Sequence, residues 1–111
     1  MDENALRRLC TEPPACAYAV AVPLIQKNDG WHLLYEVRAA SLRRQAGEVC
    51  FPGGKRESGE SAIECAVREL QEELGLSPER VIGALPFTMQ IRGGTVCPVV
   101  MLLPDTAPIP N

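Results

Sequence analysis

The sequence predicts an α+β fold in which a helix covers a mixed β-sheet. Two stretches have the features of β-hairpins, and a single helical stretch lies between them. The helical stretch carries apolar side chains at helical spacing, and such a stripe is stable only when it packs against another layer. The chain has 111 residues, 46% hydrophobic and 23% charged, which suits a single domain over residues 1–111 with a hydrophobic core.

The first predicted hairpin follows a polar or short helical lead-in over residues 1–14, which ends at a pair of prolines. A strand-like run over 15–26 predicts the first strand of this hairpin. Asn-Asp-Gly at 28–30 is a strong turn signal. Residues 31–39 are therefore expected to return as the second strand.

The helix is predicted over residues 61–74. Ser61 and Glu64 fit a capping box, in which each side chain satisfies a free backbone donor. Gly75 is a natural helix terminator. The apolar stripe of the helix consists of Ile63, Ala66, Val67, Leu70 and Leu74.

The helix is flanked by a loop and by a second hairpin. The loop is predicted over residues 41–54, with a short extended piece at 48–51. The hairpin is predicted over 77–104 as a strand, a turn at Gly93-Gly94 and a second strand. The order hairpin, loop, helix, hairpin is the basis of the predicted fold class.

Composition and charge argue against several classes of function. The formal net charge is −3 and no long basic run occurs, which argues against broad nucleic-acid binding. The five cysteines are odd in number and form no Cys-x-x-Cys pair, and the chain has one histidine, so neither zinc nor a disulfide framework is expected. No charged-then-apolar leader and no apolar run of about 18 residues occurs. We therefore expect a cytoplasmic protein without a membrane segment.

Three carboxylates crowd the second half of the helix beside Arg68. At about 100° per residue, Glu69 and Glu73 share a face and Glu72 flanks it. Like charges at this spacing repel one another by a few tenths of a kcal/mol. A hard divalent cation such as Mg²⁺ would relieve the repulsion, because it takes oxygen ligands. The alternative is a solvated acidic face with a Glu64–Arg68 ion pair.

The spacing of residues 54–76 matches the pattern G-x5-E-x7-R-E-U-x-E-E-x-G-U, in which U is aliphatic. The fixed positions are Gly54, Glu60, Arg68, Glu69, Leu70, Glu72, Glu73, Gly75 and Leu76. This pattern is the Nudix box, so the chain resembles a Nudix hydrolase domain. The resemblance implies a Nudix-type mixed β-sheet sandwich with the box helix packed on the sheet.

The resemblance also implies roles for the residues of the box. Glu69, Glu72 and Glu73 would be the Mg²⁺ or Mn²⁺ ligands, and Arg68 would orient the carboxylates through a salt bridge with Glu60. Family members cut a nucleoside diphosphate linked to another group, and a metal-activated water attacks one phosphorus. The catalytic group implied is Glu60, Arg68, Glu69 and Glu73. The general base stays open between Glu69 and a residue outside the box.

The stretch before the box is similar to the coenzyme A diphosphatase subgroup of this family. From Arg38 onward it follows the subgroup pattern R-[S/A]-x3-R-x3-G-x3-F-P-G-G, whereas Tyr35 and Glu36 depart from the Leu-Thr expected before it. The substrate-binding group implied is Arg38, Arg43, Arg44, Gly53 and Gly54. Arginines near the metal helix suit the diphosphate and 3′-phosphate of coenzyme A. The alternative is that these arginines are ordinary solvated loop residues.

The chain stops early for this fold. The Nudix sandwich normally continues with further strands and a second helix, whereas here the apolar strand over 95–103 is followed only by a short proline-containing tail. We therefore expect a chain that is incomplete at its C-terminus, with an unpaired sheet edge and an uncovered apolar face. A homodimer with shared or swapped strands would cover both.

Three functions follow from these observations. The first is metal-dependent hydrolysis of coenzyme A or acyl-coenzyme A to 3′,5′-ADP and 4′-phosphopantetheine or its acylated form. The second keeps the enzyme class and changes the substrate to ADP-ribose or another nucleoside diphosphate derivative. The third is an inactive fragment that binds nucleotide or metal, or only mediates association. The intact box favours an enzyme, and the early end of the chain favours the third function.

Overall fold

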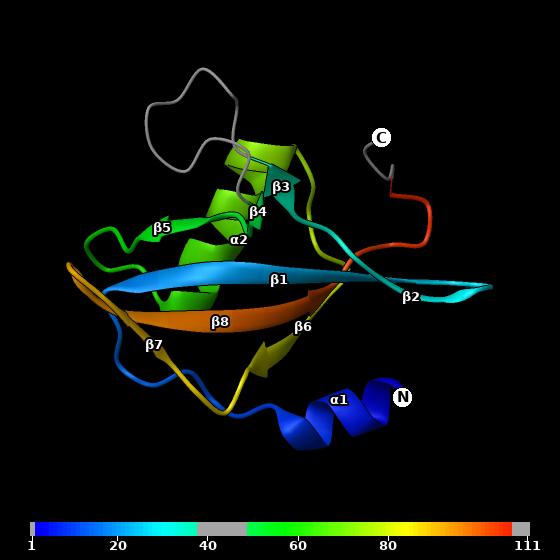
Figure 1. Cartoon of the computed structure of the whole chain (residues 1–111), viewed down its shortest axis with the longest axis horizontal. Helices are drawn as coiled ribbons and strands as arrows, with labels where there is room; N and C mark the ends of the chain where they lie inside the picture. The colour runs from blue at the N-terminus through cyan, green and yellow to red at the C-terminus, as the bar shows by residue number, and fades with distance from the viewer. Residues whose placement is uncertain (1, 38–48, 108–111) are drawn as a thin grey trace.

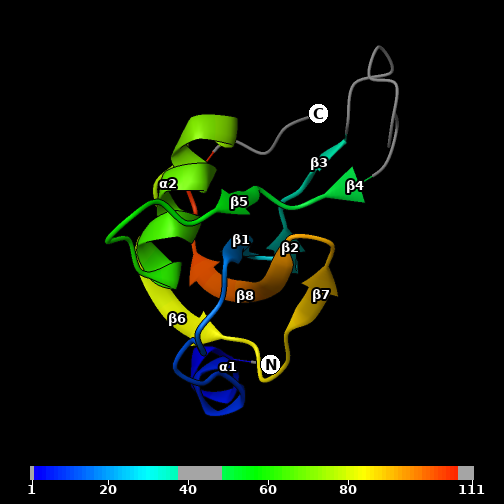
Figure 2. The ribbon, with the colours of Figure 1, turned by 90° about the vertical axis from the view of Figure 1, so that its left-hand side faces the viewer.

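The computed structural model describes residues 2–37 and 49–107. These residues form a mixed β-sheet with a long helix, α2 (Ala62–Leu74), on one face. A short helix, α1 (Glu3–Leu9), lies next to strand β6 (Arg80–Ala84) and away from α2 (Figures 1 and 2). The predicted α+β fold is confirmed. Within the described residues, no helix is long and apolar enough to cross a membrane.

The centre of the sheet is a parallel pair of strands from the two ends of the chain (Figure 1). Strand β1 (Tyr18–Lys27) pairs with β8 (Gly94–Leu102), from Tyr18 opposite Val96 to Leu24 opposite Leu102. The outer strands are all antiparallel to this pair: β2 (Gly30–Leu33), β5 (Gly53–Lys55), β6 and β7 (Met89–Ile91). The hairpin predictions did not include the parallel pair, because it joins segments that are far apart in the sequence.

The first hairpin is shorter than predicted. β1 and β2 pair around the turn at residues 28–29, but β2 ends at Leu33. The next strand, β3 (Glu36–Val37), pairs with β4 (Val49–Cys50) in a separate two-stranded sheet. The extended piece predicted at 48–51 contains β4.

The predicted loop over 41–54 included Gly53 and Gly54, and this part of the prediction is wrong. Gly53 and Gly54 lie in β5, opposite Val20 and Ala19 of β1. A Cβ on Gly53 would lie 2.7 Å from the carbonyl oxygen of Ala19, so this pairing requires a residue without a side chain. Glycine pairs usually indicate loops, which is why the strand was not predicted.

The second hairpin also differs from its prediction. The segment before the turn forms two strands, β6 and β7, and both pair with β8. The turn lies at residues 92–93, and β8 already begins at Gly94. β8 is buried on both faces over residues 96–102, so the predicted uncovered apolar face does not lie on this strand. The exposed apolar side chains nearest to β8 in sequence are Met89 and Ile91, which lie on β7, and Phe87, which lies just before it.

The hydrophobic core lies between α2 and the face of β1 and β8 that it covers. Residues alternate between buried and half-buried along β1, as expected for a strand covered more fully on one face. The side chains of α2 that are fully buried are Cys65, Ala66 and Leu70. Ile63, Val67 and Leu74 of the predicted stripe are half-buried beside them. Burial of this side leaves the other side of α2 for its charged residues.

Candidate active site

The ends of α2 are fixed by the residues predicted to fix them. The Ser61 hydroxyl accepts a hydrogen bond of 3.0 Å from the Glu64 amide, and the Glu64 carboxylate accepts one of 2.8 Å from the Ser61 amide. At the other end, Gly75 adopts a left-handed backbone (φ 70°) and its amide donates to the Gln71 carbonyl. The capping box and the glycine terminator are confirmed. Together they set which residues fall on the charged side of the helix.

Arg68 is the centre of an ion-pair network on that side. Its Nε donates to Glu60 Oε2 at 2.7 Å and its Nη2 donates to Glu60 Oε1 at 3.0 Å, which is a bidentate pair. Its Nη1 donates to Glu69 Oε1 at 3.0 Å. The predicted salt bridge between Arg68 and Glu60 is confirmed. The alternative Glu64–Arg68 pair is not formed, because Glu64 caps the helix instead.

The bidentate pair keeps Glu60 and Arg68 charged. The hydrogen bonds from Arg68, together with a hydrogen bond from the Glu57 amide, lower the pKa of Glu60 to about 2. The pairing with Glu60 raises the pKa of Arg68 above its ordinary value. The side chains of Glu60 and Glu69 are only 13% and 14% exposed, so the ion pairs are largely shielded from solvent.

The two remaining carboxylates of the box have different partners. Glu72 lies 3.3 Å from Arg68 Nη1, and its side chain is 57% exposed. Glu73 Oε2 accepts a hydrogen bond of 2.8 Å from the Gly53 amide. Glu73 therefore ties the second half of α2 to β5, a contact that the sequence analysis did not include.

Gly54 provides the space in which Glu69 lies. A Cβ on Gly54 would stand 2.6 Å from Glu69 Oε1, closer than such atoms can approach. This contact shows that β5 passes close to the helix at Gly54. On the inner side of α2, the thiol of Cys65 lies 3.5 Å from the Gly54 carbonyl oxygen. No sequence signal distinguished this cysteine from other core cysteines.

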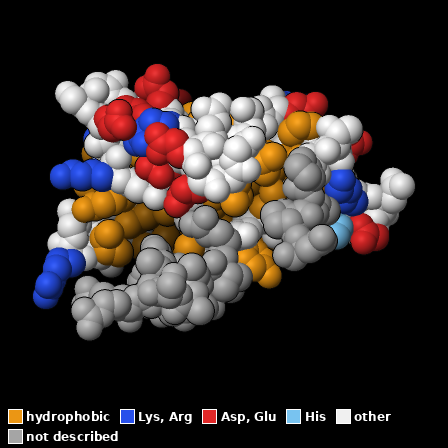
Figure 3. All heavy atoms as spheres, turned by 90° about the horizontal axis from the view of Figure 1, so that it is seen from above, with side chains coloured by type: hydrophobic (Ala, Val, Ile, Leu, Met, Phe, Trp, Pro, Cys, Tyr) orange, Lys and Arg blue, Asp and Glu red, His pale blue; other side chains and the backbone are white. Residues whose placement is uncertain are grey.

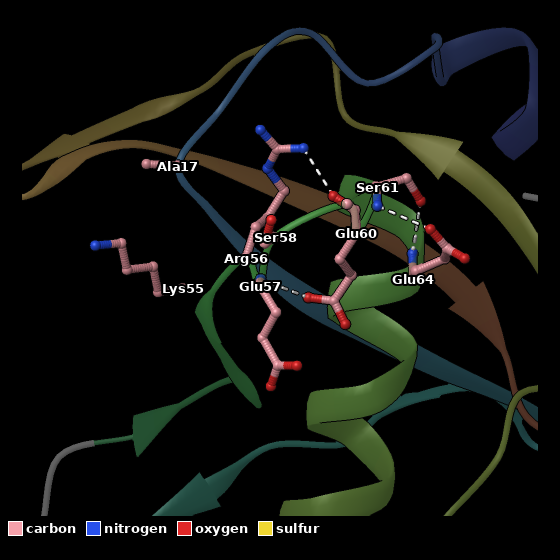
Figure 4. A pocket seen from close by; sticks show the side chains of 9 residues that line it. Ala17, Lys55, Arg56, Glu57, Ser58, Glu60, Ser61 and Glu64 are labelled. Atoms are coloured by element: carbon pink, nitrogen blue, oxygen red, sulfur yellow. Dashed lines mark hydrogen bonds between the residues drawn. The ribbon is translucent and has the colours of Figure 1, made fainter.

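A pocket of about 620 Å³ lies beside the network, over the segment between β5 and α2 (Figure 4). Lys55 and Arg56 line it together with Glu57 and Glu60. Arg56 donates to the carbonyl oxygens of Cys16 at 2.6 Å and Glu60 at 2.8 Å, so it stabilises the segment itself. Seen from above, acidic and basic side chains lie intermixed on this side of the molecule (Figure 3).

The chemical type of the donors fits a hard divalent cation, because Glu69, Glu72 and Glu73 offer only carboxylate oxygens. The space beside Gly54 lets the Glu69 carboxylate lie where β5 meets the helix. Within residues 2–37 and 49–107, no three His, Cys, Asp or Glu side chains are grouped closely enough to hold a metal ion. The carboxylates are instead paired with Arg68 and with the Gly53 amide. Metal binding by these three residues stays a prediction.

The three arginines of the predicted substrate-binding group, Arg38, Arg43 and Arg44, lie outside the described residues. Gly53 and Gly54 of the same group lie in β5, next to Glu73 and Glu69. The structure thus brings the glycines and the carboxylates together. The arginines keep the status of a prediction from the sequence.

Comparison with known proteins supports these observations. The family model described as NUDIX domain matches residues 17–101. An uncharacterized Nudix hydrolase, NudL of Cronobacter sakazakii, is 43% identical over 93 residues, which cover 81% of this chain and 48% of that protein. The chain therefore spans about half the length of the curated relatives that it matches.

Two solved structures show the same fold at low sequence identity. A Caenorhabditis elegans Ap4A hydrolase in a binary complex matches with a TM-score of 0.64 and 18% identity. The match covers 84% of this chain and 70% of the hydrolase chain. The NUDIX domain of Shewanella oneidensis NrtR, complexed with ADP ribose, has a TM-score of 0.59 and 18% identity, covering 83% and 61%.

Proposed function

Because the chain belongs to the NUDIX domain family, we propose that it hydrolyses the diphosphate bond of coenzyme A or acyl-coenzyme A. Water adds across the P–O–P anhydride, and the products are 3′,5′-ADP and 4′-phosphopantetheine or its acylated form. The observation that carries the proposal is the Glu60–Arg68–Glu69 network, which holds a shielded carboxylate beside Gly54. Family membership supports the reaction class, and the pattern from Arg38 to Gly54 supports the substrate.

Glu69, Glu72 and Glu73 would hold Mg²⁺ or Mn²⁺ in this proposal. The cation, when bound, supplies positive charge against the diphosphate and makes water a better nucleophile. Arg68 orients Glu69 through its Nη1, while its other nitrogens remain on Glu60. Glu73 is oriented by the Gly53 amide. Such contacts support the proposal, because electrostatic catalysis requires charged groups that are held in place before substrate arrives.

Arg38, Arg43 and Arg44 would bind the phosphates of the substrate. Their guanidinium groups suit phosphate because each can donate two parallel hydrogen bonds. We leave the general base open between Glu69 and a residue outside the box. In the same proposal the protein acts in the cytoplasm. It forms a homodimer with shared or swapped strands, which covers the exposed apolar side chains of the β7 edge.

A second substrate is favoured by the solved neighbours. One is described as an Ap4A hydrolase and another as complexed with ADP ribose, and both named compounds are adenosine nucleotides that contain a phosphoanhydride bond. ADP-ribose or a dinucleotide is therefore the alternative substrate for the same carboxylates. An inactive fragment that binds nucleotide or metal, or only mediates association, is the third possibility.

A competition assay separates these possibilities. The protein is incubated with equal concentrations of coenzyme A and ADP-ribose in the presence of Mg²⁺, and products are resolved by chromatography. We expect 3′,5′-ADP to appear faster than AMP, and both to disappear when a chelator removes the metal. Faster release of AMP would support the alternative substrate. Absence of both products with Mg²⁺ and with Mn²⁺ would contradict the proposed activity of this chain.

A further inference from the structure

Cys65 lies directly behind the ion-pair network, on the side of α2 that faces the sheet. It is fully buried. Its Sγ lies 3.5 Å from the Gly54 carbonyl oxygen, and Arg68 Nη2 lies 3.8 Å from the same sulfur. The thiol is thus in contact with the guanidinium group on one side and with the backbone of β5 on the other.

We propose that Cys65 is a positioning residue of the candidate active site, whose thiol joins the Arg68 guanidinium to the Gly54 backbone. This inference rests on the proposed function of the same site. The two groups that Cys65 contacts, the Arg68 guanidinium and the Gly54 backbone, also lie next to Glu69. Arg68 Nη1 donates to Glu69 Oε1, and Gly54 leaves the space for the Glu69 carboxylate. Cys65 therefore fixes the two neighbours that decide where the Glu69 oxygens lie.

The thiol is suited to this place because it is both a donor and an acceptor. Arg68 Nη2 has three acceptors around it: Glu60 Oε1 at 3.0 Å, the Lys55 carbonyl at 3.2 Å and Cys65 Sγ. The S–H can donate onward to the Gly54 carbonyl. Burial, followed by the nearby Glu60 carboxylate, raises the pKa of Cys65 to about 11, so the hydrogen is retained at neutral pH. Each bond to sulfur is weak, but together they hold a bulky atom between helix and strand.

Cys97 is the matched control. It is also fully buried in the same core, and burial raises its pKa to about 11 as well. It lies on β8, opposite Ala19 of β1, and its thiol neighbour is Cys16 and not the network. Loss of either sulfur leaves a comparable hole in the core, so effects of the hole alone will be common to both variants.

The test compares Cys65→Ala, Cys65→Ser and Cys97→Ala in the full chain. The first readout is the hydrogen-exchange rate of the Arg68 Nε–H by NMR, which requires no substrate or metal. The second is kcat and KM for coenzyme A with Mg²⁺. In Cys65→Ala we expect the exchange to be faster. We also expect kcat to fall by about 10-fold, with little change in KM, which is the lower end of the range for loss of a group that orients a metal ligand. Cys65→Ser, which retains a donor and an acceptor, should recover most of both, and Cys97→Ala should change neither.

Equal exchange rates and equal kcat in Cys65→Ala and Cys97→Ala would overturn the positioning role. So would a Cys65→Ser variant that folds but exchanges as fast as Cys65→Ala. If Cys65→Ala does not fold, Cys65→Val takes its place, because valine fills the volume without a donor or acceptor, and its exchange must be faster than that of Cys97→Val. If the wild-type chain hydrolyses nothing, the proposed function fails, while the exchange rates still decide whether Cys65 holds Arg68.

Discussion

Gly54 lies so close to Glu69 that a Cβ added to the glycine would stand 2.6 Å from Oε1 and 3.0 Å from Cδ of the carboxylate. A Cβ on the neighbouring Gly53 would meet the Val20 side chain and also backbone, at 2.7 Å from the Ala19 carbonyl oxygen and 2.9 Å from the Val20 Cα. The two adjacent glycines of β5 therefore have different roles. Gly53 allows the strand to pair with β1, and Gly54 allows a carboxylate to lie against the strand.

The first prediction separates these two roles. In Gly54→Ala the flexible Glu69 side chain moves aside, so the free energy of unfolding should stay within about 0.5 kcal/mol of wild type, while displacement of the carboxylate lowers kcat by about 100-fold. In Gly53→Ala the backbone has to move, and we expect a loss of about 1–3 kcal/mol. Urea denaturation and the coenzyme A assay measure the two quantities. A Gly54→Ala protein with unchanged kcat would show that the position of Glu69 is unimportant.

The parts of this arrangement that are local in sequence could be predicted, and the long-range parts could not. The capping box at Ser61 and the terminator at Gly75 follow from spacing along one helix, and the Arg68–Glu60 pair was implied by the resemblance to the Nudix box. The pairing of β1 with β8, and the place of Gly53 and Gly54 in a strand, depend on segments that meet only in the folded chain.

The same reason explains what was missed at the site. Cys65 looks like any other buried cysteine, because its contacts with Gly54 and Arg68 depend on how β5 crosses the helix. The hydrogen bond from the Gly53 amide to Glu73 depends on the same crossing. The sequence identified the carboxylates, but the groups that hold them belong partly to another layer of the fold.

The second prediction concerns the shape of the Arg68 side chain. An ammonium group cannot replace the fork that binds Glu60 through two nitrogens while a third donor reaches Glu69. In Arg68→Lys we expect kcat for coenzyme A to fall by about 10- to 100-fold. Arg80→Lys is the matched control, because Arg80 pairs with Glu3 away from the site. Similar losses in both variants would contradict a specific role for the Arg68 fork.

The third prediction is the acid sensitivity of the network. The pKa of Glu60 is lowered from its ordinary value of 4.5 to about 2, so its contribution to stability is complete above pH 4.5 and is lost as the pH falls to about 2. Wild type should therefore be more stable than Glu60→Gln at pH 6, and this advantage should shrink steadily below pH 4.5. Urea denaturation at pH 6, 4 and 3 measures it. An advantage that stays constant over this range would refute the linkage.

The fourth prediction concerns the end of α2. Gly75 has a left-handed backbone and no atom within 4 Å of an added Cβ, so a substitution there costs only conformational free energy. We expect Gly75→Ala to lose about 1–2 kcal/mol of unfolding free energy, and Gly75→Asn to lose less, because asparagine tolerates this conformation better. Denaturant titration distinguishes the two. Equal losses would indicate that the side chains are excluded by contact and not by backbone conformation.

The most direct measurement is the initial rate of 3′,5′-ADP release from coenzyme A with Mg²⁺ by wild type, Glu69→Gln and Glu79→Gln. Glu79 is the control carboxylate, since its side chain is 53% exposed and pairs with Arg80. We predict hydrolysis by wild type and Glu79→Gln, and a rate lower by about 100-fold or more in Glu69→Gln. Equal rates in the two variants, or no hydrolysis by wild type, would contradict the assignment of Glu69 to a diphosphatase centre.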